Sequence, residues 1–217
     1  MDESCRRILW LKFALGLFDQ PFVDEEAAKR ICKSAEHEKV AEEAMRRSLV
    51  LLKKDNLPLA SGLRIYAEGF TKEQIEAHGK FVLDYKQAEI AIIRLNVPKY
   101  PDHRDPMAMM FESGALVYPK KIKEHCLQIM KEVPTVLVIN LNRQAILGEL
   151  GERAVGVLAE FNVKPEILLQ ALFGQFSPSG QLPFSLPQNM QTLENHPSDT
   201  PLTEKESSFY RGFGETY

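Results

Sequence analysis

The sequence predicts an α/β fold with a mainly parallel open sheet and helices on both faces, a three-layer α/β/α sandwich. Three nearly continuous apolar runs are typical of strands covered on both faces: AEIAIIRLNV at 88–97, TVLVINL at 135–141 and AVGVLAEF at 154–161. Helical patterns separate the runs, and this alternation predicts right-handed crossovers and parallel pairing. With 217 residues, 44% of them hydrophobic, the chain can bury a full core in one domain.

The N-terminal part of the chain shows helical rather than strand periodicity. An amphipathic helix is expected over 3–17, followed by a connector at 19–21 that contains Asp, Gln and Pro. From 24 to 52, apolar residues recur every three or four positions, as expected of one or two helices laid on a sheet. We therefore assign 1–23 to a linker helix and connector, and 24–217 to the main domain.

The remaining elements alternate along the chain. A short strand is expected at 63–67, ahead of the three apolar runs. Helices are expected at 72–78, 120–131 and 165–173. Pro165 suits the first turn of the last of these helices. The C-terminal tail is polar and rich in turn formers until an aromatic cluster at 209–217, which is predicted to pack back as an edge strand.

Charge and composition exclude several kinds of partner. The 27 basic and 30 acidic residues give a net charge of −3, so neither nucleic acid nor a membrane is an expected partner. The three cysteines lie far apart and are expected to be reduced and mostly buried. No histidine pair has ligand spacing with a carboxylate, so no metal is predicted. The phosphate-binding motifs G-x-x-x-x-G-K-S/T and G-x-G-x-x-G are both absent, and no cofactor is predicted. Charges interrupt the N-terminal apolar run, which therefore is not a signal peptide; the compartment stays open, with the cytoplasm slightly favoured.

The loop after Val97 has the richest set of polar side chains in the sequence. In an open parallel sheet, ligands approach the carboxyl ends of the strands. The candidates for substrate binding in this loop are Tyr100, Asp102, His103, Arg104 and Asp105, and Glu112 follows them. Carboxylates, an arginine and aromatic rings are the groups that hold a sugar, and a carboxylic acid can protonate a glycosidic oxygen. An ordinary polar loop, in which Asp and Pro make turns, is the alternative.

Four ordered segments contain motifs that are too particular for generic loops. They are LGLF at 15–18, SLVLLK at 48–53 with LPL at 57–59, FGQFSPSGQLPFSLP at 173–187 and FYRGFGETY at 209–217. The first resembles the end of the barrel domain of glycoside hydrolase family 3, and the others resemble landmarks along the sandwich domain that follows it. The resemblance covers nearly the whole chain. It implies the C-terminal α/β sandwich domain of a β-glucosidase-like enzyme.

Enzymes of that family retain stereochemistry with two carboxylates, an aspartate nucleophile on the barrel and a glutamate acid/base usually supplied by the sandwich domain. The two groups must lie about 5 Å apart across the scissile bond. No segment before Leu15 is long enough to be a barrel, so 1–23 is expected to be the linker from a missing barrel domain and the isolated chain to be inactive. The implied partners are a β-glucoside or oligosaccharide substrate and a barrel domain in cis or trans.

Glu112 is the candidate acid/base. The stretch IRLNVPKY at 93–100 lacks the glycine and glutamate of the family's G-E-x-P-Y motif. It is more similar to a subgroup with R-L-x-x-P-Y at the strand end and F-H-x-G-S-L at the next helix, in which Glu112 takes the place of the histidine. A glutamate that opens a helix and interacts with its dipole is the alternative.

Arg94 and the end of the next strand complete the set of candidates. An arginine at the end of an apolar strand needs a carboxylate, because burying it unpaired costs several kcal/mol. An ion pair with Asp102 or Asp105 is favoured over contact with a sugar. The resemblance places Asn142 and Arg143 where relatives line or brace the cleft.

The competing hypothesis is a stand-alone, non-catalytic module that binds sugar or serves as a scaffold. Without a barrel, the chain would expose apolar side chains such as Trp10, Phe13 and Met109. Exposed patches of several hundred Å² tend to associate, so a homo-oligomer is expected in solution.

Overall fold

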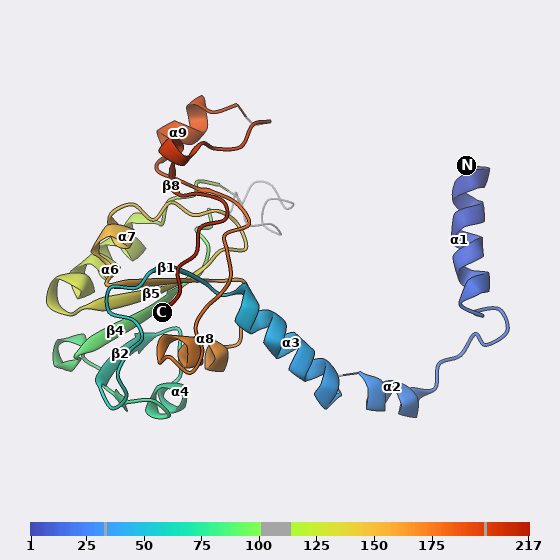
Figure 1. Cartoon of the computed structure of the whole chain (residues 1–217), viewed down its shortest axis with the longest axis horizontal. Helices are drawn as coiled ribbons and strands as arrows, with labels where there is room; N and C mark the ends of the chain where they lie inside the picture. Colours follow the sequence, from blue (N-terminus) through green and yellow to red (C-terminus); the bar gives the residue numbers. More distant parts are fainter. Residues whose placement is uncertain (33, 101–113, 198) are drawn as a thin grey trace. The chain divides into compact units, whose positions relative to one another are not determined.

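Figure 1 shows a computed structural model of the chain, which describes residues 1–32, 34–100, 114–197 and 199–217. The chain forms two compact units, Met1–Glu42 and Glu43–Tyr217. The first unit contains α1 (Asp2–Ala14), α2 (Glu25–Ile31) and the start of α3 (Ala35–Ser48). None of these three helices buries a residue.

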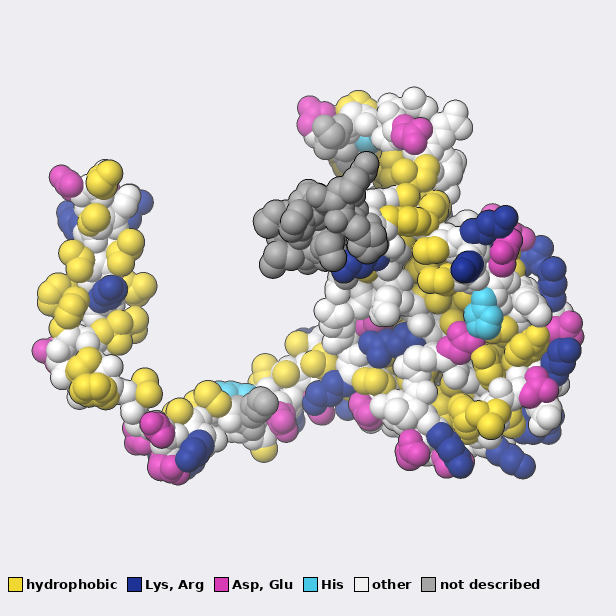
Figure 2. Space-filling model, turned by 180° about the vertical axis from the view of Figure 1, so that it is seen from behind, with side chains coloured by type: hydrophobic (Ala, Val, Ile, Leu, Met, Phe, Trp, Pro, Cys, Tyr) yellow, Lys and Arg dark blue, Asp and Glu magenta, His cyan; other side chains and the backbone are white. Residues whose placement is uncertain are grey.

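Exposed apolar side chains gather on the second half of α1, between Ile8 and Phe13 (Figure 2). Trp10 is 69% exposed and Phe13 is 67% exposed, in agreement with the sequence. Met109 lies outside the described residues. The expected self-association therefore stays a prediction, as does the division of the chain after residue 23.

The N-terminal predictions need two corrections. The helix expected over 3–17 ends at Ala14, because the chain turns at Gly16, where φ is +67°. The helical pattern at 24–52 forms α2 and α3, but its last residues form strand β1 (Val50–Lys53) instead. Those residues pair with a neighbouring strand and are almost fully buried, so tertiary pairing overrides the helical spacing. Near its end, α3 contacts the core of the main domain through Met45, which is partly buried, so the expectation of a helix laid on a sheet is confirmed there. For α2 it stays a prediction.

Within the described residues, the main sheet has six strands in the order β1-β6-β5-β4-β2-β3. The five strands after β1 are β2 (Arg64–Glu68), β3 (Lys80–Phe81), β4 (Ile90–Leu95), β5 (Thr135–Asn140) and β6 (Gly156–Glu160). All neighbours pair in parallel except β1 and β6, which are antiparallel. The predicted mainly parallel sheet is therefore confirmed.

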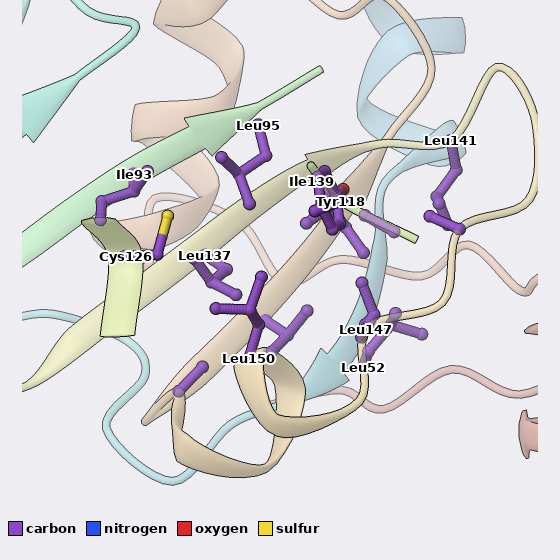
Figure 3. Packing of buried hydrophobic residues seen from close by; sticks show 14 of the residues in the cluster. Leu52, Ile93, Leu95, Tyr118, Cys126, Leu137, Ile139, Leu141, Leu147 and Leu150 are labelled. Carbon is purple, nitrogen blue, oxygen red and sulfur yellow. The ribbon is translucent and has the colours of Figure 1, made fainter. Parts of the chain in front are cut away.

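Helices cover both faces of the sheet, as predicted (Figure 1). On one face lie α6 (Lys120–Glu132) and α7 (Glu149–Arg153), and on the other α4 (Lys72–Glu76) and α8 (Pro165–Leu172). Side chains alternate along a strand, so Ile93 packs in the α6-side core with Leu137 and Ile139 (Figure 3), whereas Ile92 packs in the α8-side core. Burial on both faces explains why these strands read as continuous apolar runs.

The C-terminal part is less regular than the sequence suggests. After α8 the chain runs without a long strand to β7 (Leu186–Pro187), and β7 pairs with β8 (Ser207–Phe209) in a separate two-stranded sheet. Helix α9 (Met190–Asn195) lies between them in the sequence. The aromatic tail does pack on the core, but the edge strand expected at 209–217 is wrong, because only Glu215 makes a bridge to the main sheet.

The outer edge of β1 is covered by later parts of the chain. The Gly180 N–H donates to the Leu49 carbonyl at 2.9 Å, and the Glu215 N–H donates to the Leu51 carbonyl at 2.8 Å. Two backbone acceptors along this edge therefore have partners within the same molecule.

All three cysteines are free thiols. Cys126 is buried in the α6-side core, but Cys5 and Cys32 are exposed, so the expected burial is correct for one of the three. Both exposed cysteines lie in the unit whose helices bury nothing. Among the described residues, no helix has the length and apolar character needed to span a membrane.

Candidate functional site: the carboxyl edge of the sheet

A hydrogen-bonded network at the carboxyl ends of β4, β5 and β6 is centred on Glu160. This residue ends β6 and is completely buried. Its Oε1 accepts from Arg94 Nη2 at 3.0 Å and from Asn140 Nδ2 at 3.2 Å, and its Oε2 accepts from the Val163 N–H at 2.8 Å. A buried carboxylate requires such donors, because desolvating a charge without compensation is costly.

Arg94 reaches Glu160 across the intervening strand β5. Its side chain is 19% exposed, and Nη2 also donates to the Val163 carbonyl at 3.1 Å. The ion pair expected for Arg94 is confirmed in kind, but the partner that the structure shows is Glu160. The two aspartates that were expected as partners, Asp102 and Asp105, lie outside the described residues.

Asn162 links the loops that follow β5 and β6. Its Oδ1 accepts from Asn140 Nδ2 at 2.8 Å and from Asn142 Nδ2 at 2.9 Å. Asn162 has φ of +58°, a left-handed conformation that Asn tolerates better than most residues. The Asn142 N–H donates in turn to Asn140 Oδ1 at 3.0 Å. Asn142 is therefore held by the loops around it, with its position fixed at the edge of the sheet.

Tyr100 and Arg143 hold the two ends of the loop that follows β4. The Tyr100 hydroxyl donates to the Val117 carbonyl at 2.9 Å, and Arg143 Nη2 donates to the Gly114 carbonyl at 2.9 Å. Gly114 has φ of +85°, and a Cβ at this position would lie 2.6 Å from Tyr100 Cβ. Tyr100 and Gly114 are therefore neighbours. Arg143 Nη1 is buried and has no hydrogen-bond partner within the described part of the chain.

The structure thus groups the described candidates into two pairs. Arg94 and Asn142 belong to the Glu160 network, whereas Tyr100 and Arg143 anchor the loop ends. The other candidates lie outside the described residues: Asp102, His103, Arg104, Asp105 and Glu112. A sugar-binding role for any of them stays a prediction.

Sequence reasoning missed Glu160 and Asn162. A signal for Glu160 was available, because it is the one charged residue near the end of the apolar run AVGVLAEF, just as Arg94 is in AEIAIIRLNV. Opposite charges at the ends of two buried strands are expected to pair. Asn162 had no comparable signal, since it follows the strand in an ordinary turn sequence. Because both Glu160 oxygens are engaged and the side chain is buried, Glu160 is suited to bracing the edge rather than to contact with substrate.

The residues described include no cluster of three or more His, Cys, Asp or Glu side chains that could hold a metal ion. The polar groups along this edge are instead amides, a guanidinium and one carboxylate that engage one another. Such groups position loops and offer hydrogen bonds to a polar ligand.

Comparisons with known proteins identify the family to which this chain belongs. A scan against models of protein families finds no match. The chain is 36% identical over 223 aligned residues to a protein named probable beta-glucosidase C from Aspergillus oryzae, and 30% identical over 219 to the periplasmic beta-glucosidase/beta-xylosidase of Dickeya chrysanthemi. These alignments cover 100% and 99% of this chain. The chain belongs to glycoside hydrolase family 3.

The solved structures agree on the fold of this family 3 domain. A beta-glucosidase from Listeria innocua, in complex with gluconolactone, matches the whole chain with a TM-score of 0.77 at 19% sequence identity. The chain spans about a third of the length of the relatives, 35% for the Aspergillus protein and 38% for the Listeria structure. It corresponds to the C-terminal α/β sandwich domain of the family.

Proposed function

We propose that this chain is the sugar-facing domain of a β-glucosidase-like retaining glycoside hydrolase. The nucleophile of the proposed enzyme is an aspartate on a barrel domain outside these 217 residues. The observation that supports the proposal most strongly is the 36% identity to a probable β-glucosidase along the entire chain. The substrate class would be β-glucosides or short oligosaccharides. The 217 residues alone would not hydrolyse them, because a retaining mechanism needs both carboxylates.

The carboxyl edge of the sheet supports the proposal, because it combines a rigid base with a donor that has no partner among the described residues. The Glu160 network fixes the ends of three neighbouring strands, and rigid support is what an active-site loop requires. Arg143 has a guanidinium nitrogen without a partner in the described residues, and it holds one end of the loop with the polar candidates. We assign bracing to Arg94 and Asn142, and substrate contact to Arg143 and the loop that it holds.

The test is an activity assay on two proteins with the aryl substrate p-nitrophenyl β-glucoside. The isolated 217-residue chain should show no turnover. A chimera in which this chain replaces the matching segment of the Aspergillus oryzae relative should hydrolyse the substrate, whereas the same relative with that segment deleted should not. Turnover by the isolated chain would contradict the division of the two carboxylates. A folded but inactive chimera would support the alternative hypothesis, a non-catalytic module that binds sugar or serves as a scaffold.

Glu112 is proposed as the acid/base of the same chimera. Glu112→Gln should lower turnover of cellobiose roughly 10²- to 10⁴-fold, because a sugar leaving group needs a proton. Turnover of an activated dinitrophenyl glucoside should fall much less in the glycosylation step, since its leaving group departs without protonation. Asp105→Asn, at a substrate-binding candidate in the same loop, is the comparison: it should affect both substrates alike, because it removes a contact and not the proton donor. If Glu112→Gln leaves both substrates unaffected, another residue is the acid.

A further inference from the structure

A cavity of about 490 Å³ lies at the carboxyl ends of β2 and β4, beside the N-terminal half of α6. Its polar lining includes Glu68, the last residue of β2, and His125 from α6. Its apolar lining includes Val97, Pro98, Pro119 and Ile122. The function proposed above uses neither Glu68 nor His125.

The position of this cavity follows from the order of the strands. The chain leaves β2 through α4 toward β3, at one edge of the sheet, but leaves β4 through α6 toward β5, in the opposite direction. The two connections lie on opposite faces of the sheet, with α4 in the α8-side core and α6 in the α6-side core. Adjacent strands whose connections diverge leave a crevice between them, and ligands of open α/β sheets bind at such switch points.

Two polar side chains are held together at the mouth of the crevice. His125 Nε2 lies 2.7 Å from Glu68 Oε1, and the Tyr66 hydroxyl donates to the same oxygen at 2.6 Å. The side chains remain partly accessible, with Glu68 30% exposed and His125 52% exposed. Within the described residues, Glu68 Oε2 and His125 Nδ1 have no hydrogen-bond partner. The pair therefore offers a ligand one fixed acceptor and one imidazole nitrogen.

The lining of the crevice favours a neutral ligand with hydroxyl groups. A carboxylate accepts hydrogen bonds from adjacent hydroxyls, and an imidazole nitrogen can donate to or accept from a third. The apolar walls suit the C–H face of a sugar ring. Three cations, Arg94, Lys99 and Lys121, also line the cavity. The charge of Arg94 is balanced by its ion pair with Glu160, and Lys99 and Lys121 are exposed to water, whereas the Glu68 carboxylate repels an anion.

We propose that this crevice binds the ring of a neutral pyranose, with Glu68 and His125 as the residues that bond its hydroxyl groups. The choice of a sugar rests on the function proposed above. The crevice itself rests on the strand order, the cavity and the Glu68–His125 pair.

The experiment is a titration of the ¹⁵N-labelled 217-residue chain with glucose and with cellobiose, followed by amide chemical shifts. We expect the shifted amides to cluster at 96–99 and at 121, 122, 125 and 126, which line the crevice. Glu68→Gln and, separately, His125→Asn should each weaken binding roughly ten-fold, as expected when a hydrogen bond to a charged or aromatic-nitrogen partner is lost. His125→Asn leaves the bond between Tyr66 and Glu68 intact, so it tests the site without disturbing β2.

Glu124→Gln is the matched control, because Glu124 is the neighbour of His125 on α6 and pairs with Lys120 away from the cavity lining. It should leave binding unchanged. No shift with either sugar, shifts confined to other surfaces, or equal weakening by Glu124→Gln would overturn the proposal. Binding of inorganic phosphate in place of sugar would overturn it too, since the site would then select anions. The readout is binding by this chain, so it is independent of whether the chimera hydrolyses a glucoside.

Discussion

Among the described residues, two carboxylates at the carboxyl edge of the sheet have different surroundings. At β4–β6, the completely buried Glu160 receives donors from a guanidinium, an amide and the backbone. At β2–β4, the partly exposed Glu68 shares a single oxygen between Tyr66 and His125 and borders a cavity. The first arrangement uses its polar groups to hold strands together, whereas the second leaves some of them for a ligand.

This difference separates a structural ion pair from a candidate binding site on physical grounds. A buried carboxylate must be saturated with donors, or the fold loses several kcal/mol. A carboxylate at a cavity can keep an acceptor for a ligand, because water satisfies that acceptor until the ligand arrives. The following measurements test the contrast, from the largest expected effect to the smallest.

Glu160→Ala should cause the largest loss of stability. It leaves the Arg94 guanidinium and the Val163 N–H without their acceptor, and removing one partner of a buried pair costs about 3 to 5 kcal/mol. Equilibrium denaturation of the chain in urea measures the change. The matched control is Glu149→Ala, whose surface ion pairs with Lys123 and Arg153 should be worth less than about 1 kcal/mol. Equal losses for the two variants would contradict the assignment of Glu160 as a buried brace.

Asn162→Ala should have an intermediate effect of about 2 kcal/mol. It removes the acceptor for Asn140 and Asn142, and it places a less tolerant residue at φ of +58°. Asn162→Gly removes the same acceptor but accepts the left-handed backbone, so it should cost less than the alanine variant. If the two variants unfold at the same urea concentration, the left-handed backbone at position 162 does not contribute to the loss of stability in Asn162→Ala.

Glu68→Gln should change the free energy of unfolding by less than about 1 kcal/mol, because Glu68 is partly exposed and its interactions compete with water. The same urea titration measures it beside Glu160→Gln, which should be clearly more destabilising. A loss at position 68 as large as that at position 160 would remove the contrast between the two regions.

The smallest expected effect is a change in the pKa of the Tyr66 phenol. Burial, and then the hydrogen bond to Glu68, raise the pKa of Tyr66 to about 12. Since the pKa is higher in the folded state, the stability that this phenol contributes is complete below about pH 10 and is lost as the pH rises toward the folded pKa. Glu68→Gln should lower this pKa only in part, because burial remains. Phenolate absorbance, with Tyr66→Phe as the reference, measures the shift, and an unchanged pKa would contradict the bond.

The buried strands and the helices between them could be predicted from the sequence, because a strand covered on both faces must be apolar at every position. Residues 90–95 and 135–140 are examples, with strong patterns and nearly complete burial. Strand β1 was harder, since its four residues continue a helical spacing and become a strand only by pairing with β6. Strand β3 has two residues, too few to give a period.

The candidate site could be predicted only in part. The sequence indicated that Arg94 needs a carboxylate, but the choice of Glu160 depends on strand order, since the two are 66 positions apart. Glu68 and His125 are likewise brought together only when β2 and α6 meet at the switch point. A loop rich in polar residues is readily predicted as a candidate site from the sequence, whereas isolated polar residues at strand ends are not.

Gly180 and Glu215 occupy two backbone acceptors along the outer edge of β1. The Glu215 N–H occupies the Leu51 carbonyl, which an incoming strand would otherwise use as its first acceptor. A protein shortened before Phe213 would present that acceptor and part of an apolar strand to its neighbours. Glu215 therefore protects this part of the sheet edge from pairing with a strand of another molecule.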